Sequence, residues 1–247
     1  MDERTTTVPA IEHLPPPAGA TAPAESEPAA DLADPRILQI LSTEHWSLLS
    51  ARSLVYNEAF ARAGMFLTFV SASLVALALA ANAMTFSSGF LLLATGLLTL
   101  DLIMGVATVG RLLDATLDDL RAIHGMNRIR NGYAQIAPEI LPFLTTSIHD
   151  DAAGVMATYG VTAQSQSFVA GVLHGLSTTN GMISALNATL AGAIAGLLLT
   201  FAGAGPIASV VATLVVLAAV FSALSRHAFR TIRRFERTME PRFPTPR

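Results

Sequence analysis

The chain contains no cysteine and no lysine, and it has few charged residues of any kind. Without cysteine there can be no disulfide bond, no thiolate nucleophile and no cysteine-ligated zinc or iron–sulfur centre. Charged residues make up 13% of the chain, which is about half of the share that soluble domains carry. Because 52% of the residues are hydrophobic and gather in blocks, the composition indicates a membrane protein.

The sequence signatures of soluble enzymes are also missing. The chain has no glycine-rich phosphate loop, no nucleophile elbow and no HExxH zinc motif. His149, Asp150 and Asp151, with His124 and His174 in the same segment, match no known spacing of metal ligands. We therefore expect no catalytic residue, no metal and no cofactor. We also expect that the protein is not an enzyme and has no nucleic-acid partner.

Residues 1–35 are rich in proline and poor in large apolar side chains. They hold 7 of the 13 prolines in the chain. Such a segment buries too little apolar surface to offset the entropy cost of ordering it, so we predict that it is disordered. No basic stretch followed by an apolar one occurs there, so we expect no cleavable signal peptide.

Four later stretches are apolar and long enough to cross a bilayer as helices. About 20 helical residues at about 1.5 Å each cover the roughly 30 Å hydrocarbon core. We read the four as two hairpins, each closed by a short uncharged turn, 85–88 in the first and 203–206 in the second. The predicted spans are Gly64–Met84, Ser87–Arg111, Ile183–Gly203 and Ile207–Leu224.

Helical periodicity continues outside the first two spans. Ser42 or Thr43 is predicted to cap a helix that runs into the first span without a break. After Arg111, apolar residues recur every three or four positions until Pro138 is expected to stop the helix. The apolar face of the N-terminal helix is predicted to carry Trp46, Leu49, Ser53, Tyr56 and Phe60.

The arginines indicate the orientation of the spans. They are absent from both turns and gather in the flanks and the central connection, so the positive-inside rule places both termini in the cytoplasm of a multi-pass protein of the cell membrane. We predict an all-α fold: a four-helix transmembrane protein of two hairpins with helical cytoplasmic extensions. The predicted parts are a disordered tail (1–35), a cytoplasmic helix (36–63), hairpin 1 (64–111), a cytoplasmic helical segment (112–182), hairpin 2 (183–224) and a basic cytoplasmic tail (225–247).

Asp101 lies at the middle of the second span and is the only ionisable residue well inside any of the four. A charge there costs about 2.5–3.5 kcal/mol on insertion scales, so an intramembrane acid is a candidate functional site. Two interpretations stay open: a neutral acid in an interhelical hydrogen bond, or a proton or cation site. The candidate hydrogen-bond partners include Thr68, Ser71, Thr99, Asn187, Thr200 and Thr213.

Other features point to helix packing and to the membrane interface. Gly192 and Gly196 form a GxxxG motif, and Gly105 shares the face of Asp101, so we expect all three at helix contacts. A polar vestibule before the third span is predicted from His174, Thr178, Thr179 and Asn180. Anionic lipid headgroups are the expected partners of Arg226, Arg230, Arg233, Arg234 and Arg237, at about 1 kcal/mol each.

Three stretches carry a resemblance to a known group. Thr43–Leu67, Arg128–Glu139 and His174–Met182 are similar to segments of uncharacterised four-span integral membrane proteins from actinobacteria. The likeness covers roughly residues 40–225. It implies the four-span topology and assigns no site.

The sequence is compatible with two functions. In the first, the chain forms a homo-oligomer that acts as a channel-like or transport protein, with Asp101 facing a hydrated path. In the second, it is a non-conducting membrane scaffold or signalling protein whose cytoplasmic helical bundle binds partners. Four spans enclose little room, so conduction would favour an oligomer.

Overall fold

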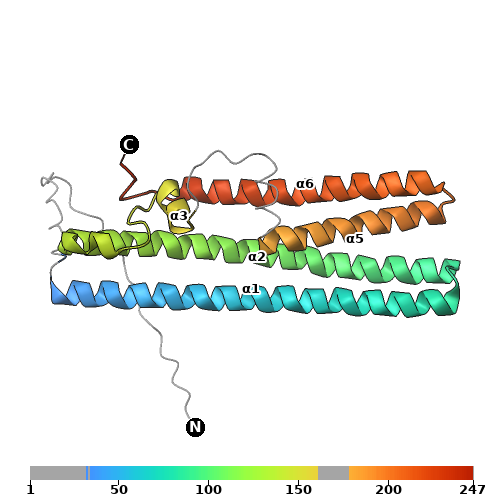
Figure 1. Cartoon of the computed structure of the whole chain (residues 1–247), viewed down its shortest axis with the longest axis horizontal. Helices are drawn as coiled ribbons and strands as arrows, with labels where there is room; N and C mark the ends of the chain where they lie inside the picture. The colour runs from blue at the N-terminus through green and yellow to red at the C-terminus, as the bar shows by residue number, and fades with distance from the viewer. Residues whose placement is uncertain (1–31, 33, 161–177, 247) are drawn as a thin grey trace, which may run out of the picture. The chain divides into compact units, whose positions relative to one another are not determined.

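A computed structural model describes residues 32, 34–160 and 178–246, which form helices joined by turns and loops and contain no strand (Figure 1). The all-α prediction is therefore confirmed for this part of the chain. Residues 1–31 and 33 of the segment predicted to be disordered lie outside the described residues, as does His174. The described elements are α1 (Pro35–Met84), α2 (Ser88–Ile136), the 3-10 helix η1 (Pro138–Phe143), α3 (Ala152–Thr158), α5 (Thr179–Phe201) and α6 (Pro206–Thr238).

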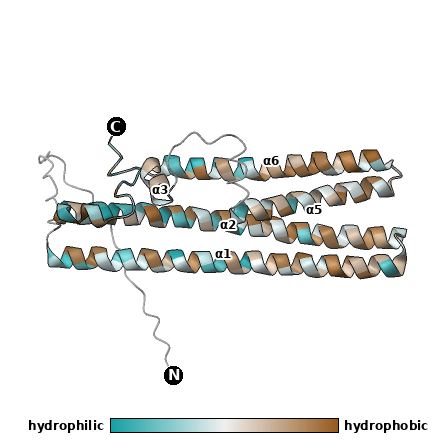
Figure 2. Cartoon of the chain, in the orientation of Figure 1, coloured by the Kyte–Doolittle hydropathy of each residue, from teal (hydrophilic) through white to brown (hydrophobic). Residues whose placement is uncertain are grey.

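Among the described helices, α1, α2, α5 and α6 are each long and apolar enough to cross a membrane. In Figure 2 the hydrophilic residues of α1, α2 and α6 gather toward one end of the helices, and hydrophobic residues dominate toward the other. A helix that is half polar and half apolar along its length suits a chain that leaves a bilayer and continues into water. These four helices indicate a membrane protein.

The N-terminus of α1 differs from the sequence prediction. The helix begins at Pro35, with Asp34 as its N-cap, and not at Ser42 or Thr43. Proline suits the first helical position because its missing N–H would have no partner there. The Thr43 hydroxyl instead donates to the carbonyl oxygen of Gln39 within the helix, at 2.9 Å. The pair Asp34–Pro35 therefore determines the start of α1, rather than Ser42 or Thr43.

Both breaks between the long helices fall at the predicted uncharged turns. Between α1 and α2, Thr85 and Phe86 adopt positive φ angles of 46° and 50°, and the Ser87 hydroxyl caps α2 by accepting from the amide of Phe90. Between α5 and α6 the chain turns at Gly203, whose φ of 81° suits glycine. Helix α2 ends at Ile136, before Pro138, as predicted.

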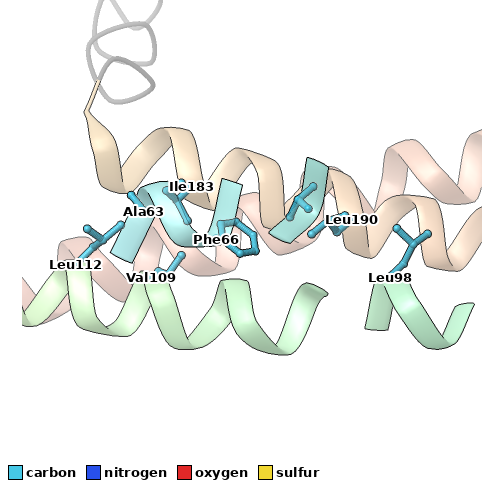
Figure 3. Packing of buried hydrophobic residues seen from close by; sticks show 8 residues of the cluster. Ala63, Phe66, Leu98, Val109, Leu112, Ile183 and Leu190 are labelled. Carbon is cyan, nitrogen blue, oxygen red and sulfur yellow. The ribbon is translucent and has the colours of Figure 1, made fainter. Parts of the chain in front are cut away.

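Each long helix packs mainly on the next one: α1 on α2, α2 on α5, and α5 on α6. One buried apolar cluster joins α1, α2 and α5, and Figure 3 shows Phe66, Val109 and Ile183 meeting in it. A second cluster lies in the more polar half, where Ile123 of α2 packs among residues from α3 and α6. The members of this second cluster and the residues packed on it include Leu120, Met126, Val155, Ile232 and Phe235.

Most of the predicted apolar face of α1 is exposed in this chain. Trp46 is 66% exposed, and Leu49 and Phe60 are exposed as well. Tyr56 of the same face donates a hydrogen bond to Asp119 of α2. Next to this face, Leu48 packs on the second cluster and Arg52 is bonded to α2.

The glycines of the GxxxG motif lie against α6 of the same chain. A Cβ atom on Gly192 would stand 2.7 Å from the carbonyl oxygen of Thr213, which is closer than van der Waals contact allows. A Cβ atom on Gly196 would overlap the Thr213 hydroxyl. The absence of side chains at these two positions thus lets α5 and α6 approach closely.

We expect Gly192→Ala to destabilise the α5–α6 contact by about 1–3 kcal/mol, because the added methyl group meets backbone. The control is Gly96→Ala on α2, where a Cβ atom has open space and helix propensity predicts a gain of about 0.5–1 kcal/mol. SDS titration of the protein in micelles gives the free energy of unfolding of each variant. Equal effects of the two substitutions would contradict the close approach.

Candidate functional site

Asp101 is completely buried where α1 meets α2. Its side chain has no exposed surface. The hydroxyl of Ser73, on α1, donates a hydrogen bond to Asp101 Oδ1 at 2.9 Å. Asp101 Oδ2 has no hydrogen-bond partner among the described residues. The carboxyl group is therefore only half satisfied by its protein surroundings.

Asn187 of α5 lies one helical turn away from this carboxyl group. It is also completely buried, and its side-chain amide donates to the carbonyl oxygen of Ile183 at 2.9 Å. A Cβ atom on Gly105 would be 2.7 Å from Asn187 Cγ, so the amide packs directly on this glycine. Gly105 is four residues from Asp101 on the same face of α2. Within the described residues, Asn187 Oδ1 has no hydrogen-bond donor.

Only one of the six predicted hydrogen-bond partners packs on this face of α2. Asn187 does so, whereas the five hydroxyl residues bond to carbonyl oxygens of their own helices. The observed partner, Ser73, was missed. Its spacing from Ala63, Phe66 and Val70, which are buried on the same face of α1, is the signal that could have found it.

Two other aspartates are buried in the more polar half of the protein, and both have arginine partners. Asp119 of α2, 2% exposed, accepts from the guanidinium of Arg52, from the hydroxyl of Tyr56 at 2.9 Å and from the hydroxyl of Tyr159. Burial, and next the nearby Asp119 carboxylate, raise the pKa of Tyr159 far above its usual range, so this hydroxyl stays a donor. The cluster joins α1, α2 and the end of α3.

Asp150 is the second of these acids and fastens the end of the chain. It has no exposed surface, and Arg128 donates to its Oδ2 at 2.5 Å. The amides of Arg242 and Phe243 donate to its two oxygens at 3.0 and 2.8 Å. Burial alone would raise the pKa of Asp150, but these donors outweigh it and hold the pKa below the usual value. Asp151 continues the attachment by accepting from the Thr245 amide at 3.0 Å.

The remaining candidates are spread along α5 and α6. The side chain of Thr178 accepts from the amide of Gly181 and caps α5, and Thr179 and Asn180 begin that helix. The five predicted lipid-contact arginines are exposed on α6. No described group of three or more histidine, aspartate or glutamate side chains could hold a metal ion.

The fold and the buried acid define a class: a helical protein with four helices long and apolar enough to cross a membrane and a buried carboxyl group on the second of them. No family model matches the chain, and neither the curated proteins nor the solved structures contain a match. The resemblance to four-span proteins from actinobacteria therefore stays a prediction.

Asp150→Ala should release residues 242 and 243, because their amides lose the carboxylate that accepts from them. Hydrogen bonds to charged groups contribute about 1.5–3 kcal/mol each, so we expect amide exchange at least ~10-fold faster there. Hydrogen–deuterium exchange with mass spectrometry measures the exchange rate of the amides in the C-terminal peptide. Glu139→Ala, an exposed acid on η1, serves as the control and should leave it unchanged.

The same attachment should depend on pH. Since the pKa of Asp150 is lowered in the folded protein, its stabilising contribution is complete above the unfolded value of about 3.9 and is lost as the pH falls through the folded value. We expect the protection factors of the Arg242 and Phe243 amides to stay constant from pH 7 to about pH 5 and to fall below about pH 4. Loss of protection between pH 7 and pH 5 would contradict this assignment.

Proposed function

We propose that the protein is a four-span, non-conducting membrane scaffold whose cytoplasmic helices bind a partner. One observation carries the choice of a scaffold over a channel-like protein: Asp101 has no exposed surface. A residue that passes ions or protons along a hydrated path must contact water, whereas this carboxyl group is enclosed by packed side chains of the same chain. The channel-like alternative would require α5 to separate from α2 at this point.

The proposed topology places both termini and the central segment in the cytoplasm. The arginine-free turns after α1 and after α5 support this orientation. With the predicted boundaries, α1 and α2 would extend about 40 Å into the cytoplasm at about 1.5 Å per residue. Asp119 and Asp150 would then lie outside the membrane, and Asp101 near its middle.

We propose that Asp101 is protonated. In hydrocarbon a lone ionised carboxylate is costly, and Asp101 has a single hydroxyl donor where Asp119 and Asp150 each have a guanidinium. One added proton would turn Asp101 Oδ2 into a donor and would leave Oδ1 free to accept from Ser73. A neutral acid would thus keep the hydrogen bond that joins α1 to α2.

In the proposed cytoplasmic part, two clusters of hydrogen bonds hold the described helices in fixed positions. The Asp119 cluster ties α3 to α1 and α2, and the Asp150 cluster ties the end of the chain to the loop before α3. A rigid helical layer with exposed side chains such as Trp46 can present a fixed surface to another protein. Anionic lipids are proposed partners of Arg226, the arginine nearest to the end of the fourth predicted span.

Proteoliposomes test the scaffold proposal. We expect proton and alkali-cation flux no greater than in empty vesicles, both for the native chain and for Asp101→Asn. The asparagine amide would keep the size of the neutral acid and still donate and accept, so the free energy of unfolding should change by less than about 1 kcal/mol. Asp101→Leu, which leaves the Ser73 hydroxyl without its acceptor, should cost about 1–3 kcal/mol. Flux that Asp101→Asn abolishes would instead establish the channel-like function.

A further inference from the structure

The arginines at the end of α6 lie on one face of the helix and point away from the bundle. Apart from the adjacent Arg233 and Arg234, they recur every three or four residues, while Ile232 and Phe235 on the opposite face pack on the second apolar cluster. All are exposed. In the part of the chain that the structure describes, none of them forms an ion pair with a carboxylate. The residues of this row are Arg226, Arg230, Arg233, Arg234 and Arg237.

Three exposed arginines on α1 and α2 have carboxylate partners, although Arg36 at the start of α1 has none among the described residues. Arg62 pairs with Glu58 at 2.8 Å, Arg111 pairs with the same glutamate at 3.0 Å, and Arg121 pairs with Asp118 at 2.5 Å. These carboxylates, from the same helix or from the helix packed beside it, neutralise the three arginines. The row on α6 therefore carries a positive charge that the described residues leave unneutralised.

The row extends too far along the helix for all its members to reach lipid. If the hydrocarbon core ends at Leu224, Arg226 and Arg230 follow at about 3 and 9 Å along the axis. Arg233, Arg234 and Arg237, the distal arginines, follow at about 14–20 Å. The headgroup layer is only about 5–8 Å thick on each side. At physiological salt an exposed charge is screened over about 8 Å, so Arg237 lies beyond the field of the headgroups, and Arg233 and Arg234 lie at its outer edge.

Helix α6 cannot lie down on the bilayer without losing its own contacts. Ile232 and Phe235 are packed on the cluster that contains Ile123 of α2. The guanidinium of Arg121 also stacks over the Phe235 ring, 4.9 Å from its centre. The distal arginines are thereby held at a fixed distance from the membrane.

We propose that the distal arginines bind an acidic segment of a cytoplasmic partner protein. This inference rests on the proposed cytoplasmic topology and names the chemistry of the partner. Guanidinium groups bind carboxylates in a bidentate manner, so an unpaired row on a rigid helix is complementary to glutamate and aspartate side chains. Arg233 stacks over the Phe229 ring at 4.5 Å, which orients its guanidinium in advance, and Phe229 is itself 56% exposed.

The surrounding charges favour a short acidic segment over a nucleic acid. Glu236 lies within the row and Glu240 follows it. These two carboxylates would repel a continuous phosphate backbone, whereas a peptide can place its own few carboxylates between them.

The test uses the full chain in nanodiscs of zwitterionic lipid, which leave both membrane faces accessible whatever the topology. The probe is a fluorescein-labelled peptide of ten glutamates, with a ten-glutamine peptide as the uncharged control, and anisotropy gives the dissociation constant. The test variant replaces the three distal arginines with glutamine. A charge-matched control variant replaces three exposed arginines that do not contact α6 with glutamine, at Arg36, Arg62 and Arg111.

We expect the distal variant to bind the glutamate peptide at least tenfold more weakly than the native chain, and the matched control to change binding less than threefold. Equal losses in both variants, or no binding by the native chain at 100 µM peptide, would overturn the proposal. So would tighter binding of a ten-nucleotide uridylate probe, which would indicate a nucleic acid. Loss of peptide binding in discs of anionic lipid would assign the distal arginines to lipid. Because none of these readouts measures flux, the binding surface and the non-conducting function can fail separately.

Discussion

The hydrogen bond from Ser73 to Asp101 reflects the constraint on which the rest of the structure depends: a buried carboxyl group must find its partners within the protein. Asp119 and Asp150 meet this constraint with arginines and further donors. No arginine lies near the middle of any predicted span, so Asp101 has only a hydroxyl. The same residue type is therefore an anchor for cations in one half of the protein and is best satisfied as a neutral acid in the other.

Small residues determine how closely the long helices can approach. Gly105 admits the Asn187 side chain between α2 and α5, and Gly192 and Gly196 bring α5 against Thr213 of α6. In hydrocarbon there is no hydrophobic gain from bringing two apolar helices together, so close packing and polar contacts have to hold them. Glycine at these points permits close packing and, at Gly105, brings a polar side chain to the face that carries the acid.

Features that depend on neighbouring residues could be predicted from the sequence, and those that depend on distant partners could not. The membrane-length helices, the breaks after α1 and α5 and the end of α2 follow from apolar runs, from the uncharged turns and from Pro138, all of which act locally, whereas the start of α1 at Pro35 was missed. The bond from Arg52 to Asp119 joins residues 67 positions apart, so the apolar stripe of α1, which includes the exposed Trp46, gives no sign of it. The hydrogen bonds from Arg242 and Phe243 to Asp150 join residues still farther apart in the sequence, and no local sequence pattern predicts them.

The arginines of α6 show how one sequence feature can have two physical roles. A positive flank after a span is sufficiently explained by orientation during insertion, and Arg226 and Arg230 fit that role by their position. The rule counts charges and sets no requirement on the face or the distance of each one. Beyond Arg230 the helix is held by its packing on α2 and α3, so the three distal charges stay exposed in one row. Selection for insertion alone gives no reason to leave that row without the carboxylates that neutralise Arg62 and Arg121, whereas recognition of an acidic partner requires it.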